Sequence, residues 1–125
     1  MFTECTIMEI IKDLQLNKIN DIILGERGSL IFNGMSFKEN TLSFVIPDER
    51  EFYRLTDNED ATPVQNFCEE NQFFSIRTRF GSVFFYNKDV DIDNLCDWDT
   101  QSKIFFFHEG YLRRKITTQG IEKLI

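Results

Sequence analysis

Hydrophobic residues near the start of the chain recur at the spacing of an α-helix. Residues at i, i+3, i+4 and i+7 lie along one side of a helix, and this pattern is met by Ile7, Ile10, Ile11 and Leu14. Thr6 and Glu9 have the spacing of a capping box, in which each side chain bonds a backbone N–H of the other residue. A second, shorter helix is predicted to begin at Thr62, because Thr62 is a good cap and Pro63 suits the first turn.

The other apolar segments are short and rich in Ile, Leu, Val and Phe, which is typical of strands. They are Asp21–Gly25, Leu30–Phe37, Thr41–Ile46, Phe73–Arg79, Ser82–Asn87, Ile104–Phe107 and Tyr111–Ile116. Turn residues join the last four segments in two pairs, which predicts two hairpins. Because parallel strands need long crossovers, we expect antiparallel pairing. The prediction is one α+β domain over residues 1–125, with an antiparallel (meander/hairpin) sheet covered on one face by the N-terminal helix and the second short helix.

Charge and cysteine content narrow the classes of partner. The chain of 125 residues has 14 Lys and Arg against 21 Asp and Glu, a net charge of −7. Non-specific binding to nucleic acid depends on neutralising phosphates, so neither nucleic acid nor an anionic membrane is an expected partner, although acidity also serves solubility alone. Three widely spaced cysteines (Cys5, Cys68 and Cys96), no basic N-terminal region and no apolar run of membrane length predict a cytoplasmic protein with buried, unreactive thiols.

No set of residues matches a known catalytic or metal-binding pattern. The segment 89–100 has acidic residues at four calcium-loop positions, but Asn94 replaces the turn glycine and Thr100 replaces the bidentate glutamate. His108 is the only histidine and has no cysteine at zinc-ligand spacing. Gly25-Glu26-Arg27-Gly28 is too short and too charged for a phosphate loop. We therefore expect no metal, no cofactor and no enzymatic activity.

Part of the chain resembles the minimal nucleotidyltransferase fold. The resemblance lies in Ile22–Gly25, Gly28-Ser29 with Leu30–Gly34, Leu42–Ile46 and the closing segment Ile116–Leu124. It implies a strand, a Gly-Ser turn and helix, and then a strand that carries paired aspartates. Thr41 and Ser43 stand where the family has those aspartates, and the third acidic position falls near Phe84, so the resemblance implies a degenerate member without a magnesium site. The competing interpretation makes Leu30–Phe37 a plain strand of a meander, and we prefer it.

Charge is segregated along the chain. Between Asp48 and Glu70 eight acidic residues stand against two arginines, and between Asn87 and Asp99 five aspartates stand against one lysine. Aromatic anchors surrounded by charge are typical of protein interfaces, while a solvated acidic face is the alternative. The predicted partner-binding residues are Asp89, Asp91, Asp93, Asp97, Trp98, Asp99, Phe52, Tyr53, Asp57, Glu59 and Asp60.

These observations favour a non-enzymatic inhibitor that binds a protein with a basic surface. The main interpretation is an immunity protein or antitoxin that neutralises a basic toxin through an acidic face with aromatic anchors. The alternatives are a degenerate nucleotidyltransferase-fold regulator that lacks the catalytic carboxylates, and a phage-encoded inhibitor of a host protein. The sequence leaves the partner and the oligomeric state open.

Overall fold

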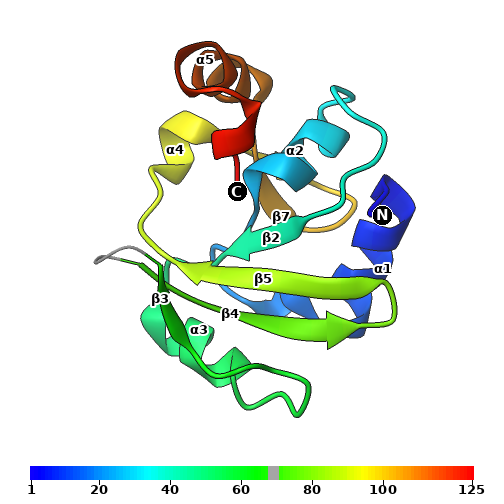
Figure 1. The fold of residues 1–125 in the computed structure, drawn as a ribbon, viewed down its shortest axis with the longest axis vertical. Coiled ribbons are helices and arrows are strands. Elements are labelled where there is room, and N and C mark those ends of the chain that lie inside the picture. Colours follow the sequence, from blue (N-terminus) through cyan, green and yellow to red (C-terminus); the bar gives the residue numbers. More distant parts are fainter. Residues whose placement is uncertain (68–70) are drawn as a thin grey trace.

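A computed structural model describes residues 1–67 and 71–125 as helices packed around one mixed sheet (Figure 1). The helices are α1 (Glu4–Asp13), α2 (Glu26–Phe32), α3 (Glu49–Leu55), α4 (Ile92–Leu95) and α5 (Glu109–Gln119), with 3-10 turns at η1 (Leu16–Lys18) and η2 (Ile121–Lys123). The strands are β1 (Ile23–Leu24), β2 (Leu42–Val45), β3 (Gln65–Phe67), β4 (Asn71–Thr78), β5 (Gly81–Asn87), β6 (Cys96–Asp99) and β7 (Ile104–Phe107).

The sheet mixes parallel and antiparallel pairs. Across the described residues its seven strands lie in the order β3-β4-β5-β2-β1-β7-β6. β2 runs parallel to β5 and β1 runs parallel to β7, while the other neighbours are antiparallel. The α+β class is confirmed, but the predicted antiparallel meander is wrong, because long crossovers bring β5 back beside β2 and β7 back beside β1.

Helices cover both faces of the sheet, and this contradicts the prediction of one covered face. On the α1 face, side chains of α1, η1 and α3 pack against alternate strand residues such as Phe44 and Phe85. On the opposite face, which we call the α5 face, side chains of α4, α5 and the C-terminal segment pack against Ile23, Val45 and Phe107. Figure 1 shows α4 and α5 together at the top and α3 at the bottom. The alternation of strand side chains produces this division, since neighbouring residues point to opposite faces.

Two local predictions are confirmed. The N-terminal helix forms, although Thr3 is its N-cap and shares its capping box with Thr6 rather than Glu9 taking part. The first hairpin also forms, with β4 and β5 paired up to Thr78 and Gly81. Gly81 has φ 122°, a backbone conformation that favours glycine.

Three segments differ from the prediction. Residues 30–32 belong to helix α2, which lies between β1 and β2, as the nucleotidyltransferase resemblance predicts and the preferred meander does not. Residues 111–116 lie in α5 instead of a hairpin strand. The helix predicted to begin at Thr62 does not form over the described residues: the Thr62 hydroxyl accepts the Ser75 N–H at 2.9 Å, and Gln65–Phe67 form strand β3. Cys68 lies outside the described residues.

The start of α2 depends on a close approach between two backbones. The Gly25 N–H donates to the Ser43 carbonyl at 2.7 Å. A Cβ at Gly25 would lie 2.0 Å from the Ser43 Oγ and 2.7 Å from the Ser43 carbonyl oxygen. A Cβ at these distances would push the start of α2 away from Ser43 on β2, so only glycine fits at residue 25.

We predict that Gly25→Ala lowers the free energy of unfolding by about 3 kcal/mol, at the upper end of overpacking costs. Gly110→Ala is the matched control, because the nearest atoms to its added Cβ lie at 3.4 Å and alanine favours a helix. Urea denaturation measures both variants. Equal stabilities for the two variants would contradict the close approach.

Candidate functional site

One row of residues crosses the three central strands at the start of α2. Ser43 on β2 lies beside Phe84 on the parallel strand β5 and on its other side faces Gly25. The neighbours of Ser43, Leu42 and Phe44, point to the α1 face, so Ser43 and Phe84 point to the α5 face. We call Gly25, Ser43 and Phe84 the central row.

The central row contains the positions that the nucleotidyltransferase resemblance assigns to metal-binding acids. The register brings Ser43, the second of these positions, beside Phe84, near which the third falls, and Thr41 is exposed just before β2. Ser43 is 1% exposed, and its hydroxyl has no hydrogen-bond partner among the described atoms. Within the described chain, no group of three or more His, Cys, Asp or Glu side chains is arranged to hold a metal ion. Hydroxyl and phenyl groups thus occupy positions where magnesium chemistry needs carboxylate oxygens.

The Gly-Ser pair of the resemblance has a structural role. Gly28 and Ser29 lie inside α2, one turn beyond its start. The buried Ser29 hydroxyl donates to the Leu24 carbonyl at 3.0 Å and accepts the Phe107 N–H at 3.0 Å. These bonds attach α2 to β1 and β7. The Gly-Ser turn predicted at residues 28–29 is therefore wrong, and Gly25 makes the turn instead.

A buried carboxylate lies directly beside the central row. Glu26, the first residue of α2, is 0% exposed. Its oxygens accept hydrogen bonds from the Lys115 ammonium at 2.8 Å, the Tyr111 hydroxyl at 2.5 Å and the Ile125 N–H at 3.0 Å. A buried charge is tolerated when it is paired and its lone pairs are satisfied. We call Glu26, Lys115 and Tyr111 the Glu26 cluster.

Burial and neighbouring charges shift the pKa values of several groups, among them Tyr111, Lys88 and Cys96. Burial and the hydrogen bond to Glu26 raise the pKa of Tyr111. Burial lowers the pKa of Lys88, which follows β5, while the charge of Glu26 acts in the opposite direction. Burial, with the charges of Asp97 and Asp91, raises the pKa of the Cys96 thiol to about 12. The Cys96 thiol is accordingly unreactive at neutral pH, whereas Cys5 is exposed, contrary to the prediction that the thiols are buried.

Aromatic rings and a polar cleft extend the site along β5. The Phe73 ring lies 6.4 Å from that of Phe84 and 5.7 Å from that of Tyr86, between centroids, on the α5 face. All three side chains are partly exposed. Beyond the end of β5 lies a polar cleft of about 550 Å³, lined by Pro47, Glu49, Asn71, Asn87, Lys88 and Asp89.

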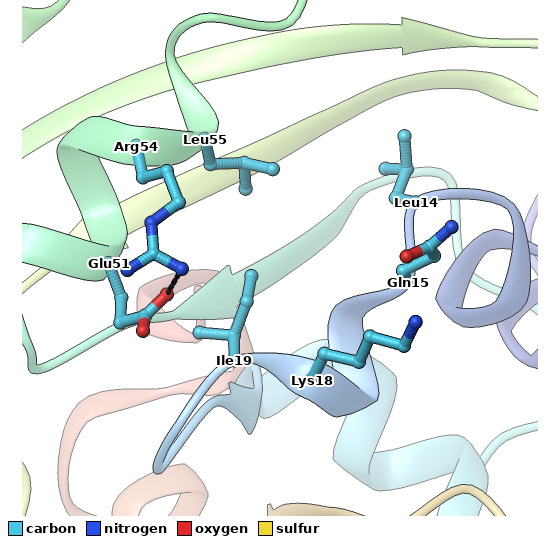
Figure 2. Close-up of a pocket in the computed structure, with 7 residues that line it drawn as sticks. All are labelled: Leu14, Gln15, Lys18, Ile19, Glu51, Arg54 and Leu55. Atoms are coloured by element: carbon cyan, nitrogen blue, oxygen red, sulfur yellow. Dashed lines mark ion pairs between the residues drawn. The ribbon is translucent and has the colours of Figure 1, made fainter.

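A different pocket lies at the edge of the core on the α1 face, between η1 and α3. It has a volume of about 270 Å³ and is lined by Leu14, Gln15, Lys18, Ile19, Glu51, Arg54 and Leu55. Figure 2 shows Arg54 directed toward Glu51, with which it forms an ion pair at 3.4 Å. Arg54 and Glu51 neutralise each other, whereas Lys18, which also lines the pocket, forms no ion pair among the described residues.

His108 caps a helix. Its Nδ1 accepts the Tyr111 N–H at 3.0 Å at the start of α5, and its Nε2 lies 2.9 Å from the Asn94 carbonyl oxygen. A neutral imidazole with its proton on Nε2 satisfies both contacts. The ring is therefore held by backbone groups on both sides.

The predicted partner-binding residues divide between the two ends of the sheet. Asp57, Glu59 and Asp60 lie in the loop between α3 and β3, near the β4 side, whereas Asp97 and Trp98 lie on β6, at the opposite end of the strand order. The loop acids at residues 57–60 thus lie apart from Asp97, whereas Glu49 and Asp89, one from each acidic segment, line the same cleft. The remaining predicted residues are Asp89 after β5, Asp91 and Asp93 at α4, Asp99 on β6, and Phe52 and Tyr53 on α3.

The two kinds of predicted aromatic anchor differ in exposure. Phe52 is completely buried in the core on the α1 face, whereas Tyr53 is 39% and Trp98 is 50% exposed. The Tyr53 hydroxyl bonds the Gln72 side chain. A partner therefore has access to Tyr53 and Trp98 and not to the Phe52 ring. Their role in binding stays a prediction.

Sequence reasoning missed the Glu26 cluster and the place of Lys88. Glu26 stands in a charged segment that suggests solvent exposure, and its partners Tyr111 and Lys115 are about ninety positions away. The one available signal was the Gly25-Glu26 pair directly after an apolar strand, which marks a helix start.

No described helix has the length and apolar character needed to cross a membrane, and the cytoplasmic location stays a prediction.

Comparison with known proteins gives one informative match. No protein-family model matches the chain, and no curated protein sequence matches it either. Among solved structures, the chain is similar to the crystal structure of a protein from Thermotoga maritima described as a "putative nucleotidyltransferase", with a TM-score of 0.71 and 13% sequence identity. The match covers 98% of this chain and 90% of the Thermotoga chain. At this identity the likeness shows a shared fold.

This likeness corrects two predictions. The fold is that of the Thermotoga protein, and not an antiparallel meander. The absence of catalytic motifs predicts no enzyme, and the likeness contradicts that prediction too, because the fold is shared with a protein whose description assigns an enzymatic activity. Neither the fold nor the comparisons support the interpretation as an immunity protein.

We predict that Lys115→Met lowers the free energy of unfolding by about 3 kcal/mol, because it leaves the buried Glu26 carboxylate without its cation. Arg113→Met is the matched control, since Arg113 pairs with Glu109 at 2.7 Å where both side chains are more than half exposed, and such pairs contribute less than about 1 kcal/mol. Thermal and urea denaturation compare the two variants. Equal losses would show that the Glu26 cluster is not a buried pair.

We predict that Lys88→Met raises the stability at pH 7 and that the gain disappears as the pH approaches 10.5, the ordinary pKa of lysine. Burial lowers the pKa of Lys88 in the folded state. The charged ammonium therefore destabilises the folded state at pH values below that lowered pKa. This destabilisation is lost as the pH rises through the lowered pKa toward the ordinary one. Urea denaturation from pH 7 to 10.5 measures the difference. A gain that does not change with pH would mean that desolvation of the ammonium is not its cause, and Lys103→Met is the control for loss of an exposed lysine.

Proposed function

We propose that this protein is a regulator with the nucleotidyltransferase fold, which lacks the metal-binding carboxylates and binds a nucleotide on its α5 face. The observation that carries the proposal is the central row. Ser43 and Phe84 lie side by side, next to Gly25 at the start of α2, where the family resemblance calls for acids. The fold is thus retained while the side chains that hold magnesium are replaced.

The likeness to the Thermotoga protein, described as a nucleotidyltransferase, suggests a nucleotide as ligand. The rings on the α5 face suit a base, because every base has a π-face that stacks on aromatic side chains. The polar cleft beyond β5 begins where these rings end, and Lys88 lines it. A base against the Phe84 ring would place a phosphate in reach of this end of the strand.

The charges of the site favour a nucleotide with few phosphates. Lys115 already neutralises Glu26, and Lys88 forms no ion pair in the part of the chain that the structure describes. Glu49 and Asp89 line the same cleft and repel additional negative charge. With one lysine available, and no group of three or more His, Cys, Asp or Glu side chains placed to hold a metal ion in the described part of the chain, a nucleoside monophosphate suits the site better than a triphosphate.

The test is calorimetric titration of the protein with the four ribonucleoside monophosphates, in EDTA and again in magnesium. We expect saturable binding of at least one of them, with the same affinity in both buffers. Lys88→Ala is expected to weaken that binding about tenfold or more, the effect of losing a charged hydrogen bond, and the control Lys103→Ala is expected to leave it unchanged.

Two results would overturn the proposal. Binding that is at least tenfold tighter in magnesium and is independent of Lys88 would show that a metal site exists elsewhere on the fold. The other result is that folded protein, checked by circular dichroism, binds none of the four monophosphates at millimolar concentration. That result would reject a nucleotide as the ligand.

A further inference from the structure

The sheet ends in a strand with one free edge. Strand β6 is last in the strand order, and within the described residues it pairs only with β7. Trp98 stands on this strand, 50% exposed, and its ring packs edge-on against Phe105 at 4.8 Å between centroids. An unpaired strand edge is a template for the addition of another strand.

The hydrogen bonds of the neighbouring strand show which backbone groups face outward. The His108 N–H donates to the Leu95 carbonyl, and the Phe105 N–H donates to the Ile22 carbonyl on the β1 side. Bonded and non-bonded pairs alternate along an antiparallel ladder, so Asp97 bonds to β7 and Trp98, opposite Phe105, does not. The Trp98 N–H and C=O therefore face the free edge. The Cys96 C=O faces it as well, while its N–H bonds the Ile92 carbonyl.

The surroundings of this edge are acidic. Asp97 is exposed on the sheet face opposite Trp98, and Asp93 is exposed on α4, which directly precedes β6. Neither carboxylate forms an ion pair among the described side chains. Asp99 is engaged by the Ser102 N–H and hydroxyl. Lys103 borders the pocket of about 290 Å³ beside Trp98 and Phe105, together with Asp21.

We propose that β6 accepts an extended, basic segment of a partner protein as an added strand of the sheet. Its backbone bonds the outward groups of Trp98 and Cys96. On one face of the added strand a Lys or Arg side chain lies over the Trp98 ring, where a cation is attracted to the π-system, and on the other face a second cation lies beside Asp97. The main-chain bonds give affinity, and the alternating side chains give specificity.

The charges distinguish this partner from a second copy of the chain. Pairing of two β6 edges would bring two acidic strands together, and like charges on neighbouring strands are destabilising. A basic strand beside β6 is instead attracted by the acidic side chains of β6. The proposal does not depend on the nucleotide site, which lies on the central strands.

The test uses peptides and the only tryptophan of the chain as reporter. The probe is a blocked octapeptide of alternating Lys and Thr, titrated against the whole protein at low salt. We expect a saturable change in the Trp98 fluorescence and slower hydrogen exchange of the Trp98 amide. The same peptide with Pro at two central positions keeps its charge and loses its strand pairing, and an octapeptide of alternating Glu and Thr reverses the charge.

Two variants distinguish binding at the β6 edge from non-specific attraction of a basic peptide to an acidic protein. Asp97→Asn is expected to weaken binding about two- to fivefold, the range for an exposed ion pair. Asp57→Asn, which removes an acid at the opposite end of the sheet, is expected to leave binding unchanged. Equal binding of the Pro peptide, or equal weakening by the two variants, would reduce the effect to non-specific charge and overturn the proposal.

Two further results would also overturn it. One is no change in fluorescence or exchange at millimolar peptide. The other is a dimer in sedimentation that Trp98→Lys dissociates, which would assign the edge to a second copy of this chain.

Discussion

The buried carboxylate of Glu26 is the interaction on which the arrangement of the α5 face depends. A charge without contact to water must have partners, and these come from two places distant in the sequence, α5 and the last residue. They hold α5 and the C-terminal segment against the start of α2, where Figure 1 shows the C-terminus. The identities of Lys115 and Tyr111 follow from this demand, since an ammonium and a hydroxyl satisfy what apolar side chains would leave unpaired.

The same carboxylate helps to explain the side chains of the central row. Glu26 follows Gly25, whose N–H bonds the Ser43 carbonyl, so a carboxylate that is already paired with a lysine comes next in the chain after the central row. Further carboxylates at the neighbouring residues 43 and 84 would repel each other unless metal ions joined them. A hydroxyl and a phenyl ring avoid this repulsion. The fold and the loss of the acids are thus compatible in electrostatic terms.

Sequence patterns predict the elements that are determined by interactions between residues close together in the chain. The stripe of Ile7, Ile10 and Ile11 gives α1, and alternation gives the β4–β5 hairpin. Helix α2 was missed because it is buried on all sides, with Leu30 in one core and Ile31 in the other, and periodicity cannot distinguish such a helix from a buried strand. Helix α5 was missed because a histidine side chain caps it. Helix α3 had a readable signal in Asp48, its N-cap, three residues before Glu51.

The candidate site was predictable only in part. The family resemblance placed Ser43 and Phe84 at corresponding positions on two strands, and the register confirms that they are neighbours. The Glu26 cluster could not be predicted, because its members come together only through tertiary packing across the whole chain. The predicted acidic face also depended on tertiary placement: the order of the strands separates the loop acids at residues 57–60 from Asp97, while Glu49 and Asp89 come together at one cleft.

The most direct test of the central claim is a crystal structure of the protein soaked with a nucleoside monophosphate and Mn²⁺, with anomalous scattering used to locate the metal. The account predicts a nucleotide on the α5 face with its phosphate near Lys88, and no manganese peak between Thr41, Ser43 and Phe84. A manganese ion held at these three positions would contradict it.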